Sequence, residues 1–107
     1  MPMINIKYDD KKVKDEEIIF LSEAVQKIVK ETTEIEDVFV YADSPKIKVD
    51  VAPIEVFVEM SRSIVLAKEK LSEDIKNKIS VWKKENNFNH PVNLTLIPMD
   101  WKFEVGI

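Results

Sequence analysis

The order of strand-like and helix-like segments constrains the fold of this chain most strongly, because it runs strand, helix, strand and then repeats once. Apolar residues at helical spacing predict one helix that begins near Asp15 and fades at Thr32-Thr33, and a second helix over about 63–85. This order predicts an α+β fold. The segments predicted as strands, rich in β-branched and aromatic residues or alternating apolar with polar ones, are 2–8, 37–42, 53–60 and 92–97.

The two halves of the chain carry matching apolar positions, which indicates an internal duplication. Three positions of the first predicted helix and three of the strand after it recur 54 positions later. We therefore predict a single domain over 1–107, with pseudo-repeats 1–51 and 52–107, folded as one mixed four-stranded sheet with two helices on one face. The matching pairs are Leu21 and Ile75, Val25 and Ile79, Ile28 and Trp82, Val38 and Val92, Val40 and Leu94, and Ala42 and Leu96.

Two of the predicted strands carry apolar residues at consecutive positions, over 38–42 and 56–58. Consecutive side chains of a strand point to opposite faces of the sheet, so both faces need burial. Two helices cover only one face, and we expect other copies of the chain to cover the second. Residues 46–51 and 101–105 alternate apolar with polar and predict short edge strands, and Pro98 is expected to end the strand before it.

The composition excludes several classes of protein. The 107 residues suffice for one domain, and the absence of Cys excludes disulfides and thiol chemistry. A single histidine excludes a multi-histidine metal site within one chain, and a single glycine excludes a glycine-rich phosphate loop. The net charge of −4 disfavours a nucleic-acid partner. No apolar run approaches the roughly 20 residues of a membrane span, and we expect a cytoplasmic protein without a membrane partner.

Pro2 follows the initiator methionine, and a methionine before a small residue such as proline is normally removed. Removal leaves a secondary amine at the start of a strand. Apolar surroundings disfavour the charged form of this amine, so that it can take a proton from carbon. If Met1 is retained, Pro2 is an amide without a basic nitrogen. Proline also suits the first position of a strand, so the pattern alone leaves a purely structural interpretation open.

Arg62 is the only arginine of the chain, and it lies between the strand predicted over 53–60 and the second helix. Its planar fork binds carboxylates bidentately, which lysine cannot do. The alternative is an ordinary surface arginine in a lysine-rich chain. His90 lies in a loop and is most simply a solvated side chain, because no nucleophile-elbow spacing supports a catalytic triad with Ser61.

The Met1-Pro2 start, the doubled β-α-β pattern and the length together resemble the tautomerase superfamily. The resemblance is closest to a bacterial branch of unknown function. There a proline-initiated strand is followed by an arginine nine positions later, as Pro53 and Arg62 stand here, and an Ile-Pro step ends the last strand, as Ile97-Pro98 does. The resemblance extends over essentially the whole chain.

This resemblance implies a homotrimer whose sheets face the threefold axis, and a first strand that lies antiparallel to residues 53–60. It also implies a cofactor-independent isomerase that moves a proton on a small 2-keto acid or its enol. Pro2 is then the catalytic base, and Arg62 is the second catalytic residue, which binds the carboxylate. Neither a cofactor nor a metal is expected.

The resemblance extends to the substrate-binding residues. Met60 and Arg62 are expected beside Pro2, and Met60 and Ser61 are expected to bind substrate. Asn93 and Thr95 are expected to enter the site from a neighbouring subunit. Two features depart from the superfamily pattern. Ser61 stands where glycine often precedes the arginine, and residues 32–36 lack a lysine that some members carry.

Two other interpretations are compatible with the same segments. The order β-α-β-β-α-β is also that of ferredoxin-like domains, many of which bind ligands or partners without catalysis. A tautomerase fold that has lost its activity is the second possibility. Fold analogy alone does not choose among these.

Overall fold

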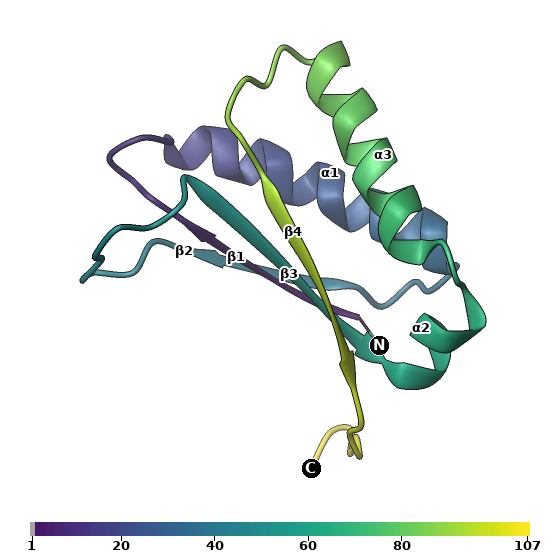
Figure 1. Cartoon of the computed structure of the whole chain (residues 1–107). Helices are drawn as coiled ribbons and strands as arrows, with labels where there is room; N and C mark the ends of the chain where they lie inside the picture. The colour runs from purple at the N-terminus through teal and green to yellow at the C-terminus, as the bar shows by residue number, and fades with distance from the viewer. Residues whose placement is uncertain (1) are drawn as a thin grey trace.

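Four strands form one mixed sheet with the order β2-β1-β3-β4 in the computed structural model, which describes residues 2–107 (Figure 1). Central strands β1 and β3 run antiparallel, while the outer strands β2 and β4 each run parallel to their central neighbour. This confirms the predicted α+β fold and the antiparallel pairing of the first strand. The elements are β1 (Met3–Tyr8), α1 (Asp15–Thr33), β2 (Phe39–Asp43), β3 (Ile54–Ser61), α2 (Arg62–Ala67), α3 (Leu71–Glu85) and β4 (Asn93–Met99).

The strand order excludes the ferredoxin-like alternative. In that fold the two strands of a β-α-β unit are split by another strand between them. Here β1 pairs directly with β2, and β3 pairs directly with β4. Each parallel pair is joined through helical structure, as a parallel connection requires.

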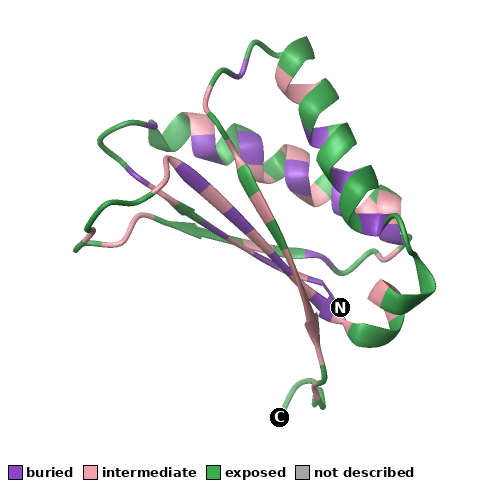
Figure 2. Cartoon of the chain, viewed as in Figure 1, coloured by how far each residue is buried: buried purple, intermediate pink, exposed green. Residues whose placement is uncertain are grey.

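Both long helices pack on the same face of the sheet (Figure 1). The central strand β3 alternates strictly between buried and half-buried residues, and every even position from Ile54 to Met60 is fully buried (Figure 2). The apolar stripe predicted for the first helix is buried throughout, and that of the second helix is buried except for Trp82, which is half-buried. The buried stripe residues are Ile18, Leu21, Val25, Ile28, Val29, Leu71, Ile75 and Ile79.

The other face of the sheet carries no helix (Figure 1). Three aromatic side chains lie on this open face at odd strand positions: Phe39 and Tyr41 on β2, which are exposed, and Phe57 on β3, which is half-buried. The consecutive apolar residues of these strands predict that a single chain leaves one apolar face of the sheet uncovered, as is found here.

The prediction of one continuous helix over 63–85 is wrong, because α2 ends at Ala67 and α3 begins at Leu71. Between them lie three charged residues, Lys68, Glu69 and Lys70, which offer no apolar side chain for burial. Lys68 leaves the helical region of backbone angles at φ −124° and ψ 85°. The apolar stripe therefore begins only at Leu71.

Three strand predictions also need correction. Pro98 does not end the last strand, because β4 continues to Met99 with Pro98 paired opposite Met60. Proline is tolerated there because β4 is an edge strand, where one side of the backbone has no ladder to complete. The segments 46–51 and 101–105 form no strand within the single chain. Each lies beyond the sheet, where no neighbouring strand of the same chain supplies hydrogen bonds.

Candidate active site

Pro2 is buried directly before β1. The antiparallel register pairs Met3 with Glu59, and one further step puts Pro2 opposite Met60 of β3. On its other side, the carbonyl oxygen of Pro2 accepts a hydrogen bond from the backbone N–H of Phe39 at 3.3 Å. The strand period of two puts Pro2 on the helix-facing side with Ile4. Pro2 is therefore held between β2 and β3 at one end of the sheet, which we call the proline end.

Arg62 lies at this same end, because it directly follows β3 as the first residue of α2 (Figure 1). Its Nε donates to both carboxylate oxygens of Asp100, at 3.1 Å each. The hydrogen bond to Asp100, and then the negative charge of that carboxylate, raise the pKa of Arg62, so the guanidinium stays charged. The side chains remain open to solvent, with 51% of Arg62 and 73% of Asp100 exposed.

A hollow of about 400 Å³ lies beside this ion pair. Two serine hydroxyls at its wall, from Ser61 and Ser63, are 3.1 Å apart and hydrogen-bonded. Pro2 and Met60 are not among its lining residues, so the hollow adjoins the proline end without containing the buried Pro2 ring. The lining residues are Ser61, Arg62, Ser63, Met99, Asp100, Trp101 and Lys102.

Asn93 and Thr95 lie away from the proline end of their own chain. Asn93 pairs with Glu55 in the β3–β4 ladder, five rows from Met60, which is about 17 Å at the usual strand rise. Its Nδ2 donates to Glu55 Oε1 at 3.1 Å. Both residues are exposed on the open face of the sheet. The single chain therefore does not bring them to Pro2.

His90 also lies away from Pro2. Its Nε2 is 2.8 Å from Glu17 Oε2 at the start of α1, and its ring stacks edge-on against Phe88. Ser61 belongs to the proline end, whereas Glu17 belongs to the opposite end of the molecule, where β1 leads into α1. A triad of Ser61 and His90 is therefore excluded, and His90 serves as a contact between the last loop and the first helix.

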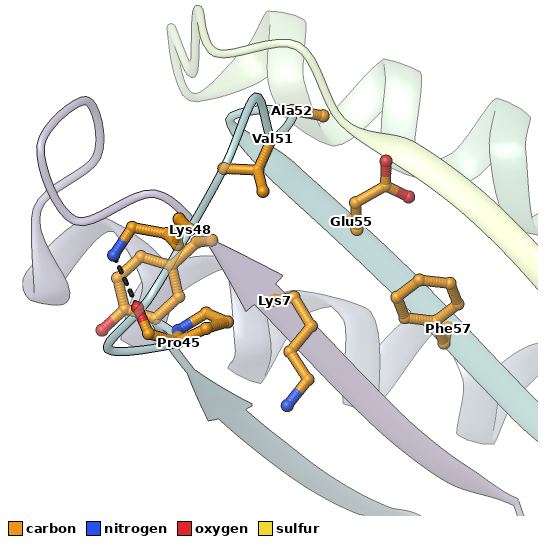
Figure 3. Close-up of a pocket in the computed structure, with 8 residues that line it drawn as sticks. Lys7, Pro45, Lys48, Val51, Ala52, Glu55 and Phe57 are labelled. Atoms are coloured by element: carbon orange, nitrogen blue, oxygen red, sulfur yellow. Dashed lines mark hydrogen bonds between the residues drawn. The ribbon is translucent and has the colours of Figure 1, made fainter.

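A second hollow, of about 260 Å³, lies at the end of the sheet opposite the proline end (Figure 3). Strand residues Lys7, Glu55 and Phe57 form one wall, and the loop between β2 and β3 forms the other. Its lysines are paired within the chain: Lys7 Nζ lies 2.7 Å from Asp43, and Lys48 Nζ lies 3.2 Å from Asp10. This hollow is not part of the proline end, and we call its surroundings the far end.

Asp100, Ser63, Trp101 and Lys102 belong to the hollow beside Arg62 and were missed in the sequence. Only the β3–β4 register leads from Arg62 to Asp100. The β3–β4 register is a constant offset of 38 residues, from Glu55 and Asn93 to Ser61 and Met99. The same offset carries Arg62 to Asp100, which is the only acidic residue between Glu85 and Glu104.

No protein-family model matches this sequence, and a search of curated proteins finds no significant match. Solved structures do match. The chain is similar to malonate semialdehyde decarboxylase, at 13% identity and a TM-score of 0.67, over 98% of this chain and 92% of that one. It is similar to a domain of unknown function (DUF1904) from Sebaldella termitidis, at 15% identity and a TM-score of 0.56, over 100% and 98%.

A third similar structure is a fused 4-OT protein that is a symmetric trimer, at 15% identity and a TM-score of 0.55, over 98% of this chain and 94% of that one. Together these likenesses establish that the chain has the fold of the tautomerase superfamily. Within residues 2–107 no cluster of His, Asp and Glu could hold a metal ion. None of the helices described is long and apolar enough to cross a membrane.

Proposed function

We propose that this protein is a tautomerase-like isomerase that catalyses keto–enol or double-bond proton transfer on a small 2-keto acid. The observation that carries the proposal is the location of a buried Pro2 at the same end of the sheet as the sole arginine. These two groups could equally have been separated by the length of the sheet. Their common location supports a site that joins a base with a carboxylate-binding group.

Pro2 acts as the base once Met1 has been removed. The secondary amine then lies in apolar surroundings beside Met60, which is fully buried. Burial disfavours the charged ammonium form and favours the neutral amine, which can accept a proton from carbon or from an enol hydroxyl. The same nitrogen returns the proton to the neighbouring position of the substrate, so no external acid is consumed.

Arg62 binds the substrate carboxylate and stabilises the enolate charge that develops as the proton leaves. Ser61 offers a hydroxyl to the same hollow. The carbonyl group of a 2-keto acid accepts the electron pair itself, and for this reason the reaction needs no cofactor.

The site is completed in a homotrimer, in which Asn93 and Thr95 of a neighbouring subunit approach Pro2. Support comes from the apolar open face of the sheet and from the similar fused 4-OT structure, which is a symmetric trimer. The exposure of Asn93 and Thr95 on that face is compatible with a role across a subunit boundary.

The test is turnover of phenylenolpyruvate, followed by ultraviolet absorbance, with protein whose N-terminal Pro2 has been verified by mass spectrometry. We expect a rate above that of buffer, and a loss of about 100-fold or more in Pro2→Ala, as for removal of a general base. Pro53→Ala, which changes the proline before β3 at the far end, is the matched control and should retain the rate. A wild-type rate equal to that of buffer, or equal rates in wild type and Pro2→Ala, would end the proposal.

A second candidate is a tautomerase fold that binds a small carboxylate without turning it over. It is favoured by one observation: Pro2 does not line the hollow beside Arg62. The two candidates separate in one experiment, because binding of phenylpyruvate without turnover of its enol supports the second and contradicts the first.

A further inference from the structure

We propose that Asp100 is a positioning residue for Arg62: it holds the guanidinium through Nε and leaves the Nη1 and Nη2 donors to a substrate carboxylate. The inference rests on the proposed function for the identity of the carboxylate, but not for the geometry of the pair. It gives a role in the site to an acidic residue that would otherwise be expected to compete with the substrate for Arg62.

The backbone brings the two residues together independently of side-chain flexibility. The β3–β4 ladder ends with Ser61 paired to Met99, and Arg62 and Asp100 are the next residue of each strand. Since both follow the last ladder position, the hydrogen-bonded sheet fixes the separation of their backbones. The pair therefore lies directly at the end of the β3–β4 ladder, which sets the spacing of the two backbones.

The hydrogen bonds engage only one side of the guanidinium. A guanidinium has five N–H donors, one on Nε and four on the two Nη atoms. Nε donates to both Oδ1 and Oδ2 of Asp100, at 3.1 Å each. Among residues 2–107, all hydrogen bonds of the Arg62 side chain come from Nε. The edge formed by Nη1 and Nη2 remains able to bind a second carboxylate bidentately.

Stability does not account for the pair. Both side chains are at least half exposed, and exposed ion pairs contribute little to the stability of a fold. The remaining effect of the pair is to orient the Arg62 guanidinium, because a long arginine side chain without a partner samples many rotamers. Lys102 lines the same hollow and supplies a second positive charge there. The hollow therefore keeps a net positive charge although Asp100 neutralises that of Arg62.

The first experiment needs no activity. Because Arg62 is the only arginine, the nitrogen-resolved NMR spectrum contains a single arginine Nε–Hε signal. We expect this proton to exchange with water several-fold more slowly in wild type than in Asp100→Ala, because a hydrogen-bonded N–H exchanges its proton more slowly than a free one. Asp50→Asn, a substitution in the far-end loop, is the control and should match wild type. Equal exchange in wild type and Asp100→Ala would overturn the proposal.

The same spectra separate positioning from competition when phenylpyruvate is added. We expect the Nη signals of wild type to shift and the Nε–Hε signal to persist, with weaker binding in Asp100→Ala. Tighter binding in Asp100→Ala would mean that Asp100 competes with the ligand, and it would overturn the proposal. So would wild-type Nη signals that do not respond to phenylpyruvate.

Kinetics supply the second arm. With phenylenolpyruvate, Asp100→Ala should raise KM about tenfold and change kcat about twofold or less, because a misplaced carboxylate clamp weakens binding first. Asp100→Asn, which keeps an oxygen acceptor at the same position, should recover part of the loss. An unchanged or lower KM in Asp100→Ala contradicts the proposal. A wild type without turnover contradicts the proposed function alone, and the NMR results still decide the role of Asp100.

Discussion

The proline end and the far end of the sheet use their polar groups differently. At the far end, polar side chains engage partners within the chain: Lys7 with Asp43, Lys48 with Asp10, and Asn93 with Glu55. At the proline end, Asp100 is the one partner of the Arg62 side chain among residues 2–107, and it is bound through Nε alone. The hollow beside it is also larger, about 400 Å³ against about 260 Å³.

This difference indicates which end is suited to bind a ligand. A charged group whose donors are already satisfied gains little from a ligand, because a new hydrogen bond must replace an old one. Arg62 keeps its Nη donors for a new partner, whereas Lys48 Nζ already contacts Asp10, Ser44 and the carbonyl oxygen of Pro45. Lys48 therefore has little left to offer a ligand, whereas Arg62 retains donors for one.

Among the substitutions that test this difference between the two ends, Arg62→Ala is expected to have the largest effect on activity. Removing the group that stabilises the developing enolate charge should lower kcat/KM for phenylenolpyruvate by about 100- to 1,000-fold. Lys48→Ala removes a cation from the far end and is the matched control, with an expected change in kcat/KM of about twofold or less. Similar losses in the two variants would remove the functional distinction between the ends.

Two core substitutions in the same strand provide the next comparison. Met60 and Ile54 are both fully buried, at the proline end and the far end of β3 respectively. Met60→Ala and Ile54→Ala should each lower the free energy of unfolding by about 2–5 kcal/mol, measured by urea denaturation. Only Met60→Ala should also lower turnover per folded molecule, because it admits water beside Pro2. Equal turnover in the two variants would contradict a role for Met60 in excluding water.

The boundary between subunits can be tested by mixing two inactive variants. In the proposed trimer, Pro2→Ala and Asn93→Ala each damage a different half of a site shared by neighbouring subunits. When the two are unfolded, mixed in equal amounts and refolded together, random assembly should restore about a quarter of the wild-type sites. Mixing two separately folded samples without subunit exchange is the control. No recovery on co-refolding would mean that Pro2 and Asn93 do not act across a boundary.

The smallest effect concerns the far end, where the backbone N–H of Lys14 and then His90 hydrogen-bond Glu17 and lower its pKa below the usual 4.5. The unfolded chain then binds a proton more readily than the folded one, so this stabilisation is present above about pH 4.5. It is lost as the pH falls through the lowered value. The difference in melting temperature between wild type and Glu17→Gln should therefore shrink between about pH 5 and pH 3.

Glu16→Gln, one residue earlier in the same helical turn, is the control for that measurement. Glu17→Gln should leave phenylenolpyruvate turnover unchanged, because Glu17 belongs to the far end. A melting-temperature difference that stays constant with pH would contradict the inferred role of the Glu17 carboxylate.

Much of the fold could be predicted from the sequence, because burial alternates in step with the residue pattern. Ile18, Leu21 and Val25 recur at helical spacing, and each is buried in α1. The four strands begin within about two residues of the predicted positions, since turns and polar residues separate them. The break at Lys68 was missed because charged residues are also common on the exposed face of an unbroken helix.

The site was only partly predictable. Pro2 stands out because it follows the initiator methionine, and Arg62 because it is the only arginine; their shared end of the sheet follows from one antiparallel pairing. Asp100 could not be paired with Arg62 before the β3–β4 register was known, because contacts across a sheet depend on register rather than on separation along the chain. The proposed role of Asn93 and Thr95 involves a second copy of the chain, and the residue pattern of one chain does not show how a second copy is oriented.

The most direct test of the central claim is the site at which an acetylenic 2-keto acid such as 2-oxo-3-pentynoate attaches to the protein. A neutral amine adds to the triple bond through its nitrogen, and the carbon next to the keto group takes up a proton. Mass spectrometry of digested protein should find one adduct per chain, on Pro2, formed about tenfold more slowly in Arg62→Ala because the carboxylate is no longer oriented. Adducts spread over the lysines, or equal rates in wild type and Arg62→Ala, would contradict a proline base and an arginine clamp in one site.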